Sequence, residues 1–148
     1  MTVVLLTKAL HIIGAAMWFA IPLTLAGDIK RTLERDREHA KWLCDRTERS
    51  LKLVLIAGLL TLATGFALIF LNGGFGAVHS GIHTGLLLTL ALFVLGVFGL
   101  RPTWKSIAQV INSERDLKEA RAYAKRFAML TGIAHLIWLV VLLAMVLR

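Results

Sequence analysis

The chain has 148 residues, of which 57% are hydrophobic, and a formal net charge of +8. This apolar content lies outside the range of ordinary soluble domains, so the sequence predicts a membrane protein. The positive charge does not indicate a nucleic-acid partner, because the cations lie in two blocks beside long apolar stretches.

Four apolar stretches are each long enough to cross a hydrocarbon layer of about 30 Å as a helix. They cover residues 2–26, 51–71, 77–100 and 127–147. Because the connections are short, we expect one all-α domain, 1–148, that forms an up-down-up-down four-helix bundle in the membrane. Small residues such as Gly58 and Gly96 would suit either packing within the chain or a homodimer.

The two basic segments, 27–50 and 101–126, are rich in alternating acids and bases, which is typical of solvated helices. By the positive-inside rule we expect both on the cytoplasmic side of an inner (cytoplasmic) membrane, with both termini outside. Their cations are also suited to anionic membrane lipid. The Arg101-Pro102 pair is expected to end the third span, and Ser113 and Asp116 have the spacing of a helix start.

Four of the five histidines are expected in the outer half of the bundle. At 1.5 Å per residue, His11 and His83 lie roughly 13 Å and 9 Å below the outer surface, and His135 roughly 18–20 Å below it. His79 lies one helical turn outward of His83. Because polar side chains inside a membrane need partners, this gathering predicts a cofactor site.

Two imidazoles from different helices at one depth are typical of a haem that is ligated on both faces. We therefore expect His11 and His83 to bind the iron of haem b. Small residues would leave room for the flat ring, and Lys8, one turn outward of His11, could pair with a propionate. The expected small residues of the pocket are Gly14, Gly58 and Gly85.

The sequence leaves several alternatives open. His135 could replace one iron ligand, bond to a ligand or a propionate, or bind a second haem with His79. A copper site is the rival cofactor site, since His79 and His83 form an i,i+4 chelating pair that His11 could complete. No carboxylate is expected at the midplane, because all nine Asp and Glu residues lie in the two basic segments.

Three of the four spans resemble a known family. The sequences "TKALHIIGAAMWFA" (7–20), "TERSLKLVLIAGLLTLATGFALI" (47–69) and "IHTGLLLTLAL" (82–92) resemble HemJ-type protoporphyrinogen oxidases and, more loosely, copper-resistance D-like membrane proteins. The resemblance implies a four-helix haem b protein with His11 and His83 at the family's histidine positions. Gly85 stands where that family has a lysine, so the resemblance supports the haem pocket more than porphyrinogen oxidation.

From these observations the sequence predicts a membrane b-type cytochrome with its haem toward the outer, periplasmic side. It would act in electron transfer or, as a haem-dependent oxidoreductase, in oxidation of a diffusible reductant. A quinol or another redox protein would be its partner. The alternative functions are a copper-handling membrane protein with an outward-facing histidine site, and a protoporphyrinogen oxidase-like enzyme.

Overall fold

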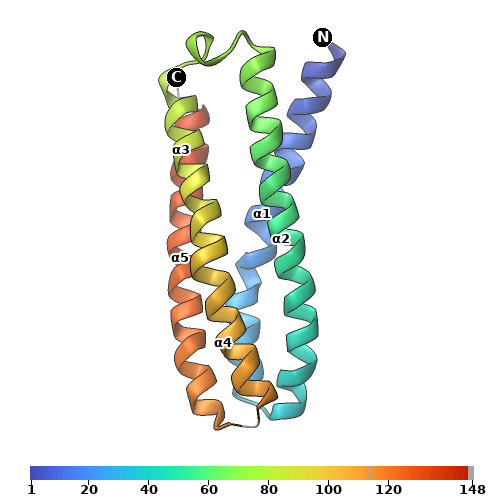
Figure 1. Ribbon diagram of the computed structural model, residues 1–148, viewed down its shortest axis with the longest axis vertical. Helices are drawn as coiled ribbons and strands as arrows, with labels where there is room; N and C mark the ends of the chain where they lie inside the picture. Colours follow the sequence, from blue (N-terminus) through green and yellow to red (C-terminus); the bar gives the residue numbers. More distant parts are fainter. Residues whose placement is uncertain (114, 147–148) are drawn as a thin grey trace.

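The computed structural model describes residues 1–113 and 115–146, and these residues form a bundle of long helices (Figure 1). Helix α1 covers Thr2–Leu33 and α2 covers Arg37–Leu71. A third helical run comprises α3 (Ser80–Val94), the π-helical turn η2 (Leu95–Leu100) and α4 (Arg101–Asn112). Helix α5 covers Leu117–Val146. The four runs are long and apolar enough to cross a membrane, which confirms the predicted four-helix membrane bundle.

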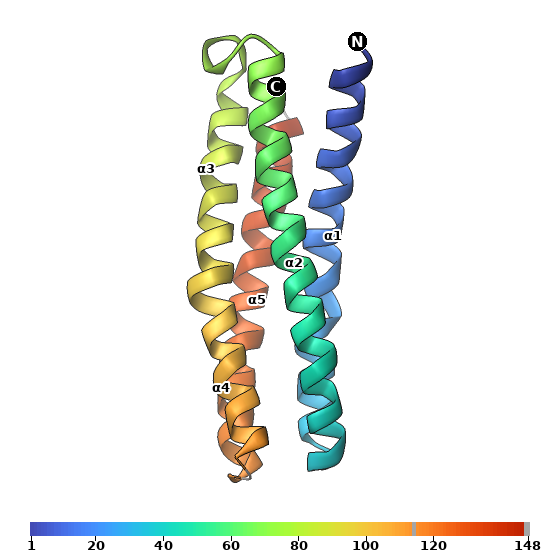
Figure 2. The ribbon, with the colours of Figure 1, turned by 45° about the vertical axis from the view of Figure 1, so that its right-hand side comes forward.

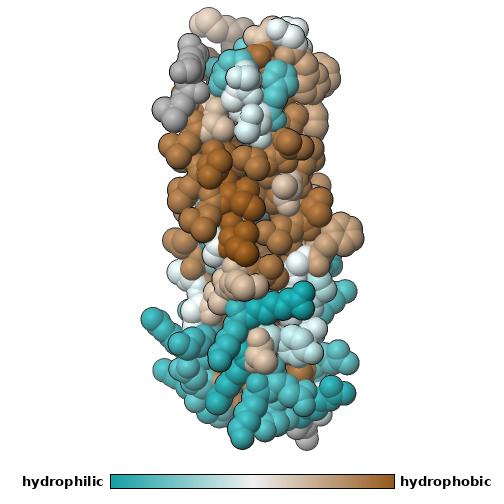
Figure 3. Space-filling view, turned by 90° about the vertical axis from the view of Figure 1, so that its left-hand side faces the viewer, coloured by the Kyte–Doolittle hydropathy of each residue, from teal (hydrophilic) through white to brown (hydrophobic). Residues whose placement is uncertain are grey.

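The bundle has two different ends. The turn 34–36, the end of α4 and the start of α5 lie at the end that carries the cations, called the basic end below. The start of α1, the end of α5 and the α2–α3 connection lie at the opposite end, called the terminal end (Figures 1 and 2). A band of apolar surface covers the middle of the molecule, and the basic end is hydrophilic (Figure 3). This distribution is that of a protein whose middle contacts lipid.

The α2–α3 connection turns sharply because it contains two glycines with positive φ. Gly73 has φ 100° and Gly74 has φ 88°, a region that other residues avoid. The short 3₁₀ helix η1 (Phe75–Ala77) follows, and the side chain of His79 accepts a hydrogen bond from the backbone N–H of Gly81 at 3.2 Å. His79 therefore caps the start of α3.

Pro102 does not break the helix that carries the third span. The helical run continues from Ser80 to Asn112 without a break. The π turn η2 precedes the proline, and the N–H of Arg101 donates to the carbonyl oxygen of Gly96 in the wider π pattern. Since Pro102 then occupies the first turn of α4, its missing N–H is tolerated there.

Both basic segments are largely helical, so the helices extend well past the apolar stretches. The side chain of Asp116 accepts a hydrogen bond from the N–H of Lys118 at 2.9 Å, beside the start of α5. Arginines then tie the helix ends together. Arg37 donates to the carbonyl oxygen of Ile111 at 2.9 Å, and Arg121 donates to that of Leu33 at 3.1 Å. These bonds satisfy carbonyl groups at helix C-termini, which have no partner within their own helix.

The tightly packed hydrophobic core lies at the basic end. It contains large side chains that are almost completely buried, including Trp104 and Phe127 at 1% exposure and Ile107 at 0%. The core residues come from α1, α2, α4 and α5: Leu25, Ile29, Leu33, Ala40, Leu43, Cys44, Trp104, Ile107, Val110, Ile111, Ala120, Ala124 and Phe127. Because water surrounds this end, burial of apolar surface stabilises it directly.

The N-cap of α2 provides a pH-dependent test of the hairpin between α1 and α2. The Asp36 carboxylate accepts hydrogen bonds from the backbone N–H and the ring of His39, at 2.9 Å and 2.8 Å, and these bonds lower its pKa below 3.8. A lowered folded-state pKa gives stability that is present above the unfolded-state pKa and is lost as the pH falls through the folded-state pKa.

We expect Asp36→Ala to lower the thermal midpoint of unfolding modestly at neutral pH and to have no effect once the wild-type carboxyl is protonated. Asp36→Asn is the matched control, because asparagine also caps helices but does not titrate. Circular dichroism melts between neutral pH and about pH 2, well below the reference pKa of aspartate, check this. A cost of Asp36→Ala that is the same at every pH would contradict the assignment.

Candidate functional site

The most polar part of the membrane interior is the contact between α1 and α2 near the terminal end. Nδ1 of His11 lies 3.0 Å from the carbonyl oxygen of Thr61 and 3.1 Å from Oγ1 of Thr64. That hydroxyl donates its own hydrogen to the carbonyl oxygen of Leu60 at 2.6 Å, so it can accept from the ring. Since a carbonyl oxygen can only accept, Nδ1 of His11 carries the proton.

The other ring nitrogen, Nε2, is therefore unprotonated in the neutral ring and has a free lone pair. Among the described residues it has no hydrogen-bond partner. A histidine that binds a metal typically donates its second N–H to a backbone carbonyl, which fixes the tautomer and the ring orientation. His11 has this arrangement.

Small residues let α1 and α2 approach closely around this histidine. A Cβ at Gly65 would lie 3.3 Å from Cε1 of His11, and one at Gly14 would lie 2.9 Å from Oγ1 of Thr61. A Cβ at Gly58 would lie 3.1 Å from the ring of Trp18. Gly14 and Gly58, which were expected to leave room for a haem, therefore face protein atoms.

A cavity of about 270 Å³ lies between the helices beside His11. Its wall is mostly apolar, and the polar side chains are the imidazole, two threonines and the indoles of Trp18 and Trp138. The lining residues come from all four helical runs: His11, Ile12, Ala15, Ala16, Trp18, Thr61, Thr89, Leu92, Trp138, Val141, Leu142 and Met145. This mixture of a mainly apolar wall and a few polar groups is typical of a cofactor or small-molecule site.

The structure does not bring His83 to this cavity. Its exposed ring donates from Nε2 to the carbonyl oxygen of Phe75 at 3.1 Å and lies beside the ring of Phe75. The inward residues of α3 at the cavity are Thr89 and Leu92. Since His83 and Leu92 are nine residues apart, at about 100° per residue they lie on opposite faces of the helix.

The remaining predicted residues lie in separate places. His135 bridges α5 and α1, with Nδ1 at 2.7 Å from the Thr131 carbonyl oxygen and Nε2 at 3.3 Å from that of Phe19. His79 uses Nδ1 as the cap of α3. Lys8 is exposed one turn outward of His11. None of these three side chains lines the cavity.

Gly85 belongs to the contact between α3 and α5. A Cβ there would lie 2.7 Å from atoms of Met145, so only a glycine at this position leaves space for the methionine side chain. Within residues 1–113 and 115–146, no group of three or more His, Cys, Asp or Glu side chains is arranged to hold a metal ion. In the alternative copper site, His11 would complete the pair of His79 and His83, and these three histidines do not form such a group in the described residues.

Sequence reasoning missed several lining residues of the cavity. Trp138 and Met145 gave no signal, because aromatic and methionine side chains in a span are usually in contact with lipid or in packing contacts. Thr61 and Thr64 share a helical face with Gly58 and Gly65, and this spacing is the signal by which they could be found from sequence.

No family model matches the chain, and the comparisons with curated proteins and with solved structures found no match.

Proposed function

We propose that this protein is a membrane b-type cytochrome in which Nε2 of His11 binds the iron of a haem in the central cavity. The observation that supports this proposal is the fixed tautomer of His11: Nδ1 donates to the carbonyl oxygen of Thr61, and the free lone pair of Nε2 is on a ring that lines the cavity. An imidazole nitrogen that has neither a hydrogen-bond partner nor a bound metal costs free energy inside a membrane. The free Nε2 of His11 therefore favours a bound iron.

The lining residues suit an apolar, flat prosthetic group. Two indoles, Trp18 and Trp138, and several aliphatic side chains supply apolar contact. The volume of about 270 Å³ is near the lower limit of ligand pockets, which is about 300 Å³. Binding a haem therefore requires some lining side chains to turn outward, and the exposed Ile12 and Leu142 are free to do so.

Met145 is the better candidate for the second iron ligand. It lies across the cavity from His11, because His11 is held against α2 and Met145 is held against Gly85 of α3. The two are at similar depths: Gly65, beside His11, is six residues before the end of α2, and Gly85 is five after the start of α3. At 1.5 Å per residue these are roughly 9 Å and 8 Å from the connection.

His83, the second ligand expected from sequence, would need α3 to turn by about half a revolution to reach the cavity. It would also lose its bond to Phe75. Met145, rather than His83, would therefore hold the haem together with His11, and methionine with histidine is a known ligand pair for haem iron.

A haem bound at His11 would supply one-electron redox chemistry. The apolar wall of the cavity excludes water, and Lys8 is placed one turn toward the terminal end to pair with a carboxylate. By the charge rule that end faces outward, so a quinol or another redox protein would exchange electrons there. An absorption spectrum of the purified protein tests the proposal. Colourless protein with bound copper, or turnover of a porphyrinogen, would favour one of the two alternative functions.

The assignment of Met145 predicts a specific spectroscopic change. We expect Met145→Leu to retain haem but to convert it from a six-coordinate, low-spin species to a five-coordinate one, and Met145→His to lower the midpoint potential. Met17→Leu is the matched control, since Met17 lies on an exposed face of α1 and does not line the cavity. The result that would overturn the assignment is this same spectral change in His83→Ala with none in Met145→Leu.

A further inference from the structure

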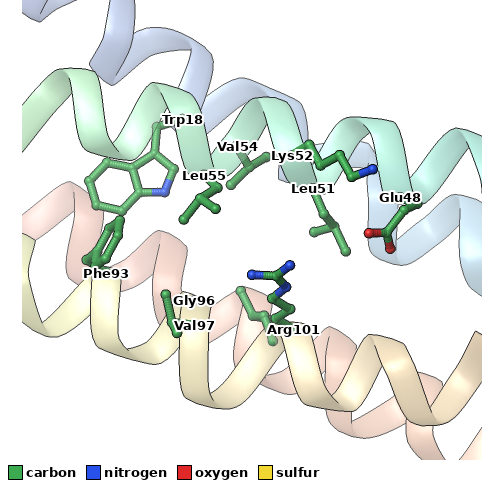
Figure 4. Close-up of a pocket in the computed structure, with 11 residues that line it drawn as sticks. Trp18, Glu48, Leu51, Lys52, Val54, Leu55, Phe93, Gly96, Val97 and Arg101 are labelled. Carbon is green, nitrogen blue, oxygen red and sulfur yellow. The ribbon is translucent and has the colours of Figure 1, made fainter.

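A second hollow lies in the other half of the bundle, between α2 and the third helical run. Its apolar wall is made by side chains of α1, α2, α3 and η2, and it is called the lateral groove below (Figure 4). The residues that define it are Trp18, Leu51, Leu55, Phe93, Gly96 and Val97. Trp18 also lines the His11 cavity, so its indole separates the two hollows.

Two cations lie at the basic end of the lateral groove. Lys52 and Arg101 both line it, and Figure 4 shows the guanidinium of Arg101 pointing from its helix toward α2. Neither side chain has a hydrogen bond or an ion pair within the part of the chain that the structure describes. Glu48 also lines this end, but its carboxylate accepts a hydrogen bond from Nε1 of Trp104 at 3.3 Å. The three charges leave a net positive site.

These cations are at the level where a phospholipid headgroup lies. Lys52 stands at the start of the apolar stretch 51–71, and Arg101 directly follows the apolar stretch 77–100. The groove then continues toward the middle of the membrane as far as Trp18, which contacts α2 at Gly58. Six residues separate Lys52 from Gly58, so the apolar part is roughly 9 Å long.

The groove is narrow, with a volume of about 60 Å³, and it is open to its surroundings at Gly96. A Cβ at Gly96 would meet nothing within 4 Å. This glycine belongs to the π turn η2, a feature that is frequent at functional sites. The lateral groove is apolar and ends in two unpaired cations at the membrane boundary. These features suit a molecule with a hydrocarbon chain and an anionic headgroup.

We propose that the lateral groove binds an anionic phospholipid, with its phosphate between Lys52 and Arg101 and one acyl chain lying along Leu55 and Gly96 toward Trp18. This site is independent of the haem proposal, because its defining cations and Gly96 do not line the His11 cavity. A lipid bound there would hold the basic end at the membrane surface whose anionic lipids attract cations.

Native mass spectrometry of the detergent-solubilised full chain tests the proposal. Phosphatidylglycerol and phosphatidylcholine with identical acyl chains are added at equal concentrations, and the retained lipid is counted. We expect the wild type to retain one phosphatidylglycerol, and Lys52→Gln/Arg101→Gln to weaken its binding roughly tenfold or more. Arg49→Gln/Lys105→Gln removes the same charge from exposed positions outside the groove and should leave binding unchanged.

A second pair of variants tests the chain-binding part. Gly96→Leu places a side chain into the groove and should reduce retention, whereas Gly132→Leu should not, because Gly132 also has open space but lies outside the groove. Equal retention by all variants would overturn the proposal. So would a loss in Gly96→Leu without a loss in the doubly neutralised variant, since that pattern indicates an uncharged ligand such as a quinone.

Discussion

Replacing His11 with alanine is expected to abolish stoichiometric haem binding. The substitution removes the only imidazole on the cavity wall, as the structure describes it, and leaves the Thr61 carbonyl oxygen and the Thr64 hydroxyl oxygen without the N–H that donates to them. Loss of an outer-shell partner alone weakens a metal site by 10–100-fold, so loss of the ligand should exceed roughly 100-fold. The ratio of haem absorbance to protein absorbance after purification measures the effect.

The controls for this experiment are other histidines of the chain. His39→Ala should retain full haem, because His39 is exposed and bonded to Asp36 at the basic end. His135→Ala should also retain it, with a less stable fold, since that ring joins α5 to the carbonyl of Phe19 on α1. Normal haem content in His11→Ala would refute the ligand assignment.

Phe127→Ala is expected to destabilise the protein by about 3–5 kcal/mol, the usual cost of deleting a fully buried aromatic side chain. Phe127 is 1% exposed and makes an edge contact with Trp104, with ring centroids 6.5 Å apart. Helix α5 would lose its main anchor in the core at the basic end. Denaturation in mixed micelles, followed by circular dichroism, gives the change in the free energy of unfolding.

Phe98→Ala is the matched control for that measurement. Phe98 is 76% exposed on the membrane-facing part of the third run, so its removal creates no cavity in the protein. We expect a change within about 0.5 kcal/mol, as for other surface substitutions. Equal losses for the two phenylalanines would show that the basic end does not dominate the stability of the bundle.

The fold was largely predictable, because hydropathy and helix length are constraints that the bilayer imposes on the sequence itself. The feature that the sequence did not reveal is the unbroken continuation of the helix through Pro102. The restriction that proline places on the preceding residue concerns only the local backbone. It does not predict the π turn before Arg101, which shifts the hydrogen-bond pattern of the helix.

The candidate site was predictable only in part. Depth along a helix follows from residue number, so His11 and His83 were correctly expected in spans one and three, near the terminal end. The direction of a side chain around its helix depends on which neighbours that helix packs against. Because α3 turns Thr89 and Leu92 inward, His83 lies on the opposite face, and depth alone could not reveal this.

The position of the core has a consequence for assembly. Inside lipid, burial of apolar side chains gains little, because the surrounding tails are equally apolar. The four helices are therefore held together mainly by the core at the basic end, which contains Ile107 and its neighbours. The half toward the terminal end contains the cavity beside His11. A bundle held together at one end can fold before any ligand enters the hollow, because the helices of the opposite half can separate while the core at the basic end stays packed.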